Sequence, residues 1–240
     1  MRHLWFALVL AALVALALPL AAGAISLDVE ANAGAGLGLG STNNPAETGS
    51  PRFAFQGGIE GDLFLFRAGP VDLGFSTGLE YDNMTNHGTV NNPAIPALGE
   101  PAITVDSDND YVYLIVPFVL TSRIPLSQSM NLTLRAGGFY GFFMGGQATN
   151  ITYNPAVGGP TSATLNSSNT PPGLLGLHFS GGVDFGLGGG LFLSPSVIFN
   201  MGLTNTTGTS MTNYTFGNGS TYVDSLWSLS LLIGIKYNVF

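Results

Sequence analysis

The sequence predicts an all-β protein, an eight-stranded antiparallel up-and-down transmembrane β-barrel. Three observations lead to this fold class. Apolar residues recur at every second position in most of eight separate stretches, which is the periodicity of strands rather than helices. Only 8% of the residues are charged, whereas ordinary soluble domains contain about 25%. The links between the stretches alternate between long and short, as in barrels whose long loops all lie at one end.

Residues 1–24 have the pattern of a secretory signal peptide. Arg2 provides a basic start, residues 4–17 form an apolar run, and residues 22–24 form a small Ala-Gly-Ala cleavage site. The apolar run is shorter than the ~18 residues that a spanning helix needs. The sequence therefore predicts cleavage after residue 24 and a barrel domain over residues 25–240.

The amino-acid composition argues against several kinds of functional site. The chain has no cysteine, which excludes disulfides and thiolate metal sites. Its 34 glycines are about twice the usual share, and glycine permits the close strand approach and strong twist of a small barrel. The formal net charge of −8 argues against a nucleic-acid partner.

The first three predicted strands cover residues 26–40, 53–66 and 71–82. In the first, odd positions are apolar and even positions are polar or glycine, and the other two show the same alternation over most of their length. Residues 41–52 are rich in turn formers and predict a long loop. The four residues 67–70 predict a tight hairpin.

The fourth predicted strand, residues 111–120, follows a long polar link over residues 83–109. It is apolar on both faces and contains Pro117. Because proline cannot donate to a strand ladder, we expect a β-bulge near the end of this strand.

The remaining strands complete the count of eight. They are predicted at residues 130–144, 175–187, 191–203 and 225–240, joined by a compact link at 121–129, a long loop at 145–172, a tight turn at 188–190 and a polar loop at 204–221. In the last strand the apolar row runs from Trp227 to Val239, and Lys236 lies on the opposite face. This row is long enough for a membrane-spanning strand, which needs ~9–11 residues.

Three segments carry a resemblance to a known family. They read YLIVPF at residues 113–118, LRAGGFYG at 134–141 and GIKYNVF at 234–240. The chain resembles the small eight-stranded outer-membrane barrels, and most closely the PorT-like outer-membrane β-barrel domain family. The resemblance implies a location in the bacterial outer membrane. It implies as partners the membrane lipid, lipopolysaccharide or its equivalent, and the barrel insertion machinery, for which Tyr237 and Phe240 would form the terminal signal.

The inward faces of the predicted strands carry a set of charged and titratable residues. They are Glu30, Glu60, Asp62, Glu80, Arg135, His178, Asp184 and Lys236. Because the first and last strands of a barrel are neighbours, we expect Glu30 to face Lys236. By the same reasoning, Arg135 in the fifth strand is expected to face Asp184 in the sixth. Two interpretations stay open for this lumen network: a salt-bridged structural plug, or a gated path that prefers cations.

Alternate aspartates at Asp106, Asp108 and Asp110 resemble the start of a calcium loop. The glycine and the closing glutamate of such a loop are missing, so these residues are a weak metal candidate and a solvated acidic loop is favoured.

Catalytic residues are scarce in this sequence. Outside residues 1–24 the histidines are His87 and His178, so few bases are available to activate a nucleophile. We therefore expect no enzymatic activity and no cofactor.

These observations favour an integral outer-membrane protein that anchors polar loops at the cell surface around a charged, plugged lumen. The alternative is a narrow cation-preferring channel, or a transporter of small solutes, including hydrophobic ones. The sequence does not identify a ligand that the loops would bind.

Overall fold

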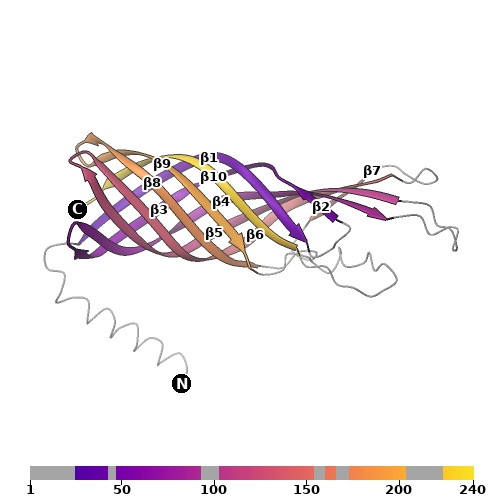
Figure 1. Ribbon diagram of the computed structural model, residues 1–240, viewed down its shortest axis with the longest axis horizontal. Helices are drawn as coiled ribbons and strands as arrows, with labels where there is room; N and C mark the ends of the chain where they lie inside the picture. The colour runs from indigo at the N-terminus through magenta and orange to yellow at the C-terminus, as the bar shows by residue number, and fades with distance from the viewer. Residues whose placement is uncertain (1–24, 43–46, 93–102, 154–159, 166–172, 204–223) are drawn as a thin grey trace, which may run out of the picture.

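The computed structural model describes residues 25–42, 47–92, 103–153, 160–165, 173–203 and 224–240. Within these residues the chain forms ten strands, and eight of them close into a barrel (Figure 1). The barrel strands are β1 (Ser26–Thr42), β3 (Arg52–Ala68), β4 (Val71–Asn92), β5 (Ile103–Ser127), β6 (Met130–Tyr153), β8 (Gly173–Gly188), β9 (Leu191–Gly202) and β10 (Asp224–Asn238). The short strands β2 (Glu47–Ser50) and β7 (Pro160–Leu165) add to β4 and β6. The predicted signal peptide lies outside the described residues.

Each barrel strand pairs antiparallel with the next one in the chain. The first and last strands then close the barrel, with Glu30 of β1 opposite Lys236 of β10. This arrangement confirms the predicted fold class. No helix in the described part of the chain is long and apolar enough to cross a membrane.

The barrel wall has an apolar outside and a polar inside. On β10, for example, Leu231 and Ile233 are 69% and 66% exposed, whereas Ser230 and Lys236 are buried. Side chains alternate between the two faces of a strand, so the period-two pattern of the sequence directly produces this polarity.

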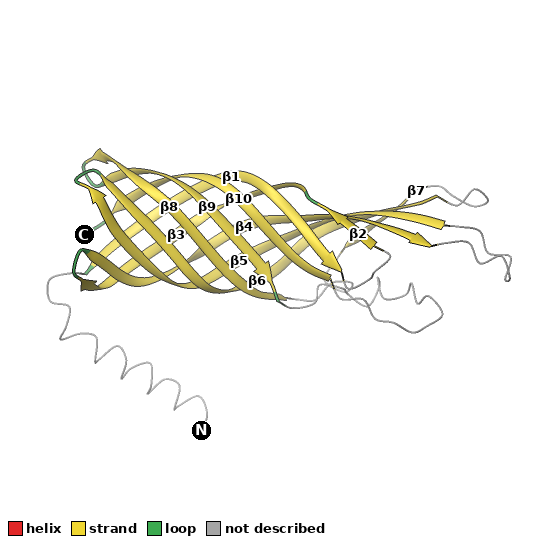
Figure 2. Cartoon of the chain, viewed as in Figure 1, coloured by secondary structure: helices red, strands yellow, loops and turns green. Residues whose placement is uncertain are grey.

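Tight turns join the strands at one end of the barrel (Figure 2). The turn between β8 and β9 contains Gly188, Gly189 and Gly190 with φ angles of 99°, 62° and 80°. These angles lie in the left-handed region, which glycine adopts without steric cost. The glycine triplet therefore makes this short connection possible.

Beyond the other end, β4, β5 and β6 continue as an extended sheet (Figure 1). β4 and β5 pair from Met84 and Tyr111 outward to Asn92 and Ile103, and β7 adds to β6. The predicted long loops at 83–109 and 145–172 were therefore wrong over much of their length. These segments have no single apolar face, so periodicity alone could not identify them as strands.

The extended part of β4 bends into the barrel mouth. Its ladder with β3 stops at Asp82 and Gln56, and the Thr85 hydroxyl then donates to the Phe53 carbonyl at 3.1 Å. A Cβ atom on Gly38 of β1 would lie only 2.5 Å from the Thr85 carbonyl oxygen. Glycine at this position therefore lets β4 pass directly over the inner face of β1.

The bulge expected near the end of the fourth predicted strand does not lie at its proline: the β5–β6 register shifts between Val112 and Tyr113 and between Pro125 and Ser127. Pro117 lies opposite Phe139 of β6 in an unshifted register. On the β4 side the pairing stops at Thr77 with Phe118 and resumes at Glu80 with Ile115, with no residue inserted. The missing proline donor is thus accommodated by a short gap in one ladder, and the register at Pro117 is unchanged.

Candidate functional site

The lumen holds a central charge cluster organised around Arg135 of β6. Its guanidinium group contacts Glu30 at 2.8 Å, Glu60 at 3.1 Å and Asp62 at 2.6 Å. These carboxylates come from β1 and β3, so Arg135 reaches across the barrel interior. Arg135 is buried together with all three partners, and water does not screen these ion pairs.

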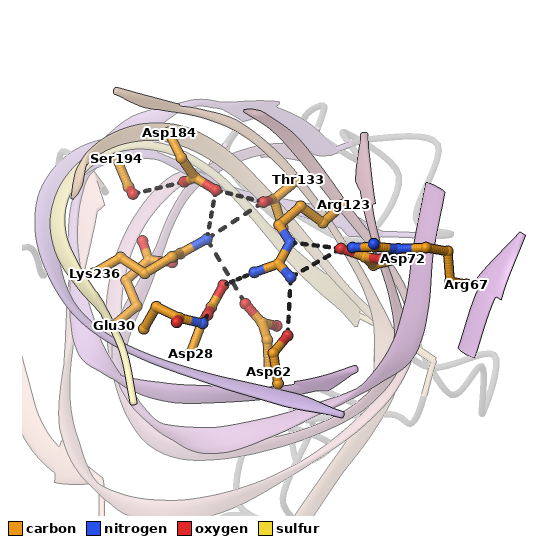
Figure 3. A network of polar contacts seen from close by, with 12 residues as sticks. Asp28, Glu30, Asp62, Arg67, Asp72, Arg123, Thr133, Asp184, Ser194 and Lys236 are labelled. Carbon is orange, nitrogen blue, oxygen red and sulfur yellow. Dashed lines mark hydrogen bonds and ion pairs between the residues drawn. The ribbon is translucent and has the colours of Figure 1, made fainter. Parts of the chain in front are cut away.

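Lys236 of β10 forms the second positive centre (Figure 3). Its Nζ lies 3.0 Å from Asp184, 3.5 Å from Glu30 and 3.7 Å from Asp62. Asp184 also accepts hydrogen bonds from Thr133 at 2.7 Å and from a serine of β9 at 2.6 Å. Arg135 and Lys236 thus share Glu30 and Asp62, which links both cations into one network.

The expected pair of Glu30 and Lys236 is present. The expected pair of Arg135 and Asp184 was wrong: Arg135 lies opposite Ser180, and Asp184 lies opposite Asn131. Alternation in the sequence assigns a residue to a face of the sheet, but it does not give the register between neighbouring strands. The long arginine side chain then finds its partners on the far side of the narrow lumen.

A second polar layer lies nearer the extended sheet. The Gln56 amide donates to Glu80 Oε2 at 2.8 Å. Asp82 accepts hydrogen bonds at one oxygen from Asn200 at 3.0 Å and Ser228 at 2.8 Å. His178 Nδ1 contacts the Asn200 side-chain oxygen at 2.8 Å and lies 3.8 Å from Glu80. This layer therefore contains two carboxylates and, among its described residues, no lysine or arginine.

An arginine that the sequence analysis did not select closes the short-turn end of the lumen (Figure 3). Arg123 of β5 binds Asp28 at 2.9 Å and Asp72 at 2.9 Å, and it donates to Ser26 at 2.9 Å. Its guanidinium carbon lies 4.3 Å from the ring centroid of Phe64. Arg123 therefore bridges β5 and β1 across the short-turn end of the lumen.

Asp72 is the second residue of β4, at the short-turn rim of the barrel, and Arg67 of the adjoining strand end binds its other oxygen at 2.7 Å. Burial raises the pKa of Asp72, but hydrogen bonds from Arg67 and Arg123 outweigh this effect and place the pKa below its usual value. Asp72 is thus held as a carboxylate between two arginines. Asp28 and Asp72 both occupy inward positions of the alternating pattern, so the sequence could have indicated this site.

An apolar cluster fills the opposite end of the lumen. It comprises Met84, Tyr111, Tyr113, Ile115, Phe139, Leu174 and Leu226, all buried. The Tyr113 ring packs edge-on against Phe143 with 5.6 Å between ring centroids. The fourth predicted strand supplies three of these residues, which explains why its sequence is apolar on both faces.

The acidic segment around Asp108 lies in a strand rather than in a loop. Asp106, Asp108 and Asp110 occupy alternate positions of β5, an extended geometry that cannot wrap around a calcium ion as a turn does. The Asp108 carboxylate instead contacts His87 at 2.5 Å and Arg52 at 3.2 Å.

The two predicted terminal signal residues lie on the outside of the barrel end. Tyr237 is 50% exposed and Phe240 is 62% exposed. Pairing with β1 continues past β10, because the Leu27 amide donates to the Phe240 carbonyl at 3.3 Å. Their role in insertion stays a prediction.

Neither a protein-family model nor a curated protein sequence matches this chain, so the resemblance to the PorT-like family is not supported. Solved structures of small outer-membrane barrels are similar in fold. Neisserial surface protein A shares 12% identity over 90% of this chain and 98% of its own, with a TM-score of 0.39. Ail of Yersinia pestis shares 9% identity over 90% of this chain and 99% of its own, with a TM-score of 0.35.

A third similar structure corrects the expectation that the chain is not an enzyme. It is the outer membrane protease OmpT of Escherichia coli, which shares 10% identity over 90% of this chain and 96% of its own, with a TM-score of 0.37. A barrel fold thus does not exclude catalysis. At such identities and TM-scores no activity transfers to this chain.

The polarity of the structure identifies its environment. Large apolar side chains are exposed around the barrel, including Phe75, Phe118 and Ile233, while charged side chains are buried inside. Every barrel strand is hydrogen-bonded on both sides over the wall, so backbone groups are satisfied without water. This inverted polarity is that of a transmembrane barrel. The chain is an eight-stranded β-barrel of the bacterial outer membrane.

Proposed function

We propose that this protein is a closed membrane anchor that holds a β-sheet at the cell surface. The observation that carries the proposal is the occupation of the lumen at both ends. Arg123 bridges Asp28 and Asp72 at the short-turn end, and the cluster around Tyr113 fills the other end. Between them, the ion pairs of Arg135 occupy the centre.

The extended sheet supports the anchoring role. β5 has 25 residues, whereas crossing a membrane takes about 9–11. In outer-membrane barrels the short turns face the periplasm and the long connections face outward. The sheet of β4, β5 and β6 would therefore project from the cell surface, and the sequence of these segments is rich in threonine, asparagine and aspartate.

The test is ion leakage through the purified protein. In planar bilayers and dye-loaded liposomes, we expect the wild-type barrel to add no measurable conductance and no release of small solutes. Because the two ends are blocked independently, Arg123→Ala alone is expected to stay tight. Combining it with Tyr113→Ala and Phe139→Ala should produce ion leakage, provided that the variant still shows the heat-modifiable gel shift of a folded barrel.

A steady wild-type current would overturn the closed-anchor proposal and favour the channel alternative. One specific observation supports cation preference in that case. Among the described lumen residues of the central cluster and second layer, six carboxylates stand against two permanent cations, Arg135 and Lys236. The carboxylates are Glu30, Glu60, Asp62, Glu80, Asp82 and Asp184. Reversal potentials in a salt gradient would measure this preference.

A further inference from the structure

The second polar layer of the lumen has three acceptor oxygens without a hydrogen-bond donor. They are Gln56 Oε1, Glu80 Oε1 and Asp82 Oδ1. All three residues are completely buried, with 0% exposure. A buried carboxylate or amide oxygen without a partner costs free energy comparable to a lost hydrogen bond, and an uncompensated charge costs more. A positively charged species beside these three oxygens would satisfy them together.

The three oxygens belong to neighbouring side chains. Gln56 of β3 lies directly opposite Asp82 of β4 in the ladder, and side chains in such pairs are about 5 Å apart at Cβ. Glu80 is the next inward residue on β4, and the Gln56 amide group donates to its Oε2 at 2.8 Å. The Gln56 side chain therefore adjoins both carboxylates.

No basic side chain of the described lumen neutralises this layer. Arg135 is occupied by Glu30, Glu60 and Asp62. The His178 Nδ1 lies 3.8 Å from Glu80, beyond hydrogen-bonding distance, and contacts Asn200 instead. Asp82 receives only neutral donors, from Asn200 and a serine hydroxyl. The charge of Glu80 and Asp82 is therefore unbalanced by the protein itself.

We propose that Gln56, Glu80 and Asp82 bind one hard metal cation inside the barrel. Carboxylate and amide oxygens are the ligands of sodium, potassium, calcium and magnesium rather than of soft transition metals. A proton on Glu80 would satisfy only one of the three oxygens, whereas a cation coordinates all three. The described residues contain no metal-binding group of three or more carboxylate, thiol or imidazole side chains. This site differs because its third ligand is an amide.

The position of the site determines how the cation enters. Beyond it lies the apolar cluster of Tyr113, and toward the short-turn end lie Arg135 and then Arg123. The cation is therefore captured while the barrel closes and exchanges slowly afterwards.

The experiment refolds the protein from urea into detergent micelles at pH 8. Parallel samples contain the chloride of sodium, potassium, calcium, magnesium or N-methylglucamine at equal ionic strength. We expect at least one metal cation to raise the temperature at which the folded gel band disappears by roughly 5 °C relative to N-methylglucamine. Elemental analysis after desalting should find about one such ion per barrel, because the enclosed ion does not wash out.

Matched variants test the ligands. Glu80→Gln combined with Asp82→Asn removes both charges with little change in shape, and this variant should refold equally well in every salt and retain no ion. Asp62→Asn, a buried lumen carboxylate that is paired with Arg135, should lower stability in every salt while keeping the metal dependence.

Two outcomes overturn the proposal. One is a wild-type melting temperature that is the same in all salts with no retained metal, which would mean that protons neutralise Glu80 and Asp82. The other is a metal dependence that persists in the double variant, which would place the ion elsewhere. Ion leakage through the wild-type barrel would contradict the closed-anchor proposal but would not test the cation site. The cation site is tested separately, by the dependence of refolding on the salt and by the variants of Glu80 and Asp82.

Discussion

Replacing Arg135 by methionine is expected to prevent the barrel from reaching its folded state, or to destabilise it by about 3–5 kcal/mol. Removing one partner of a buried ion pair leaves the other charge uncompensated, and costs of this size are typical. Here one side chain contacts Glu30, Glu60 and Asp62, and it shares Glu30 and Asp62 with Lys236. Urea titration in micelles, followed by the heat-modifiable gel shift, measures the effect.

Two control variants distinguish the loss of buried charge pairing from the loss of side-chain packing in this prediction. Arg52→Met removes an ion pair with Asp108 whose two side chains are 38% and 36% exposed, and such partly exposed pairs contribute less than about 1 kcal/mol. Adding Glu30→Gln and Asp62→Asn to Arg135→Met should recover part of the loss, since the unbalanced charges are gone. Equal urea midpoints for wild type and Arg135→Met would show that the network is not needed for folding.

Replacing Gly36 by valine is expected to disrupt the seam between the first and last strands. A Cβ atom at this position would lie 2.5 Å from the Ser230 Cα and would meet the Leu229 carbonyl oxygen. Both contacts involve β10 backbone, which cannot move aside without breaking the ladder. Overpacking of well-packed sites costs 1–3 kcal/mol and occasionally more, so we expect about 3 kcal/mol or greater here.

Gly61→Val is the matched control for the seam. Gly61 is also a strand glycine, but the nearest atoms to its Cβ position are carbonyl oxygens of Asp28 and Thr77 at 4.0 Å. Because valine favours strands, this substitution should be neutral or slightly stabilising. The folded fraction after refolding, read on unheated gels, compares both variants. If the two variants refold alike, close strand approach at Gly36 has no role in stability.

The sequence was sufficient to predict the barrel because its wall separates an apolar medium from a polar interior. Each strand therefore carries a period-two pattern, and β10 shows it from Trp227 to Val239. That β1 and β10 are neighbours followed from closure alone, because the first and last strands of a barrel must meet. Both conclusions depend only on the order of the strands, and neither requires atomic positions.

The other contacts required information that alternation does not contain. Arg135 binds carboxylates across the lumen instead of Asp184 beside it, because strand register and side-chain reach decide the partner. Arg123 was assigned to a link between strands, but β5 continues to Ser127 and places its side chain at the mouth. The β4 and β5 extension has no apolar face above the membrane, so no periodicity marks its strands.

The seam between β1 and β10 constrains how this chain assembles. Strands that close the barrel are separated by nearly the whole domain, and contacts of such high sequence separation form late and slowly. Until they form, Lys236 and Glu30 remain hydrated, and the edges of β1 and β10 are unpaired. Closure must therefore remove water from a lysine and several carboxylates in the same step that joins the two edges. We therefore expect closure to be cooperative, and chains that have not closed to be the species most prone to aggregate.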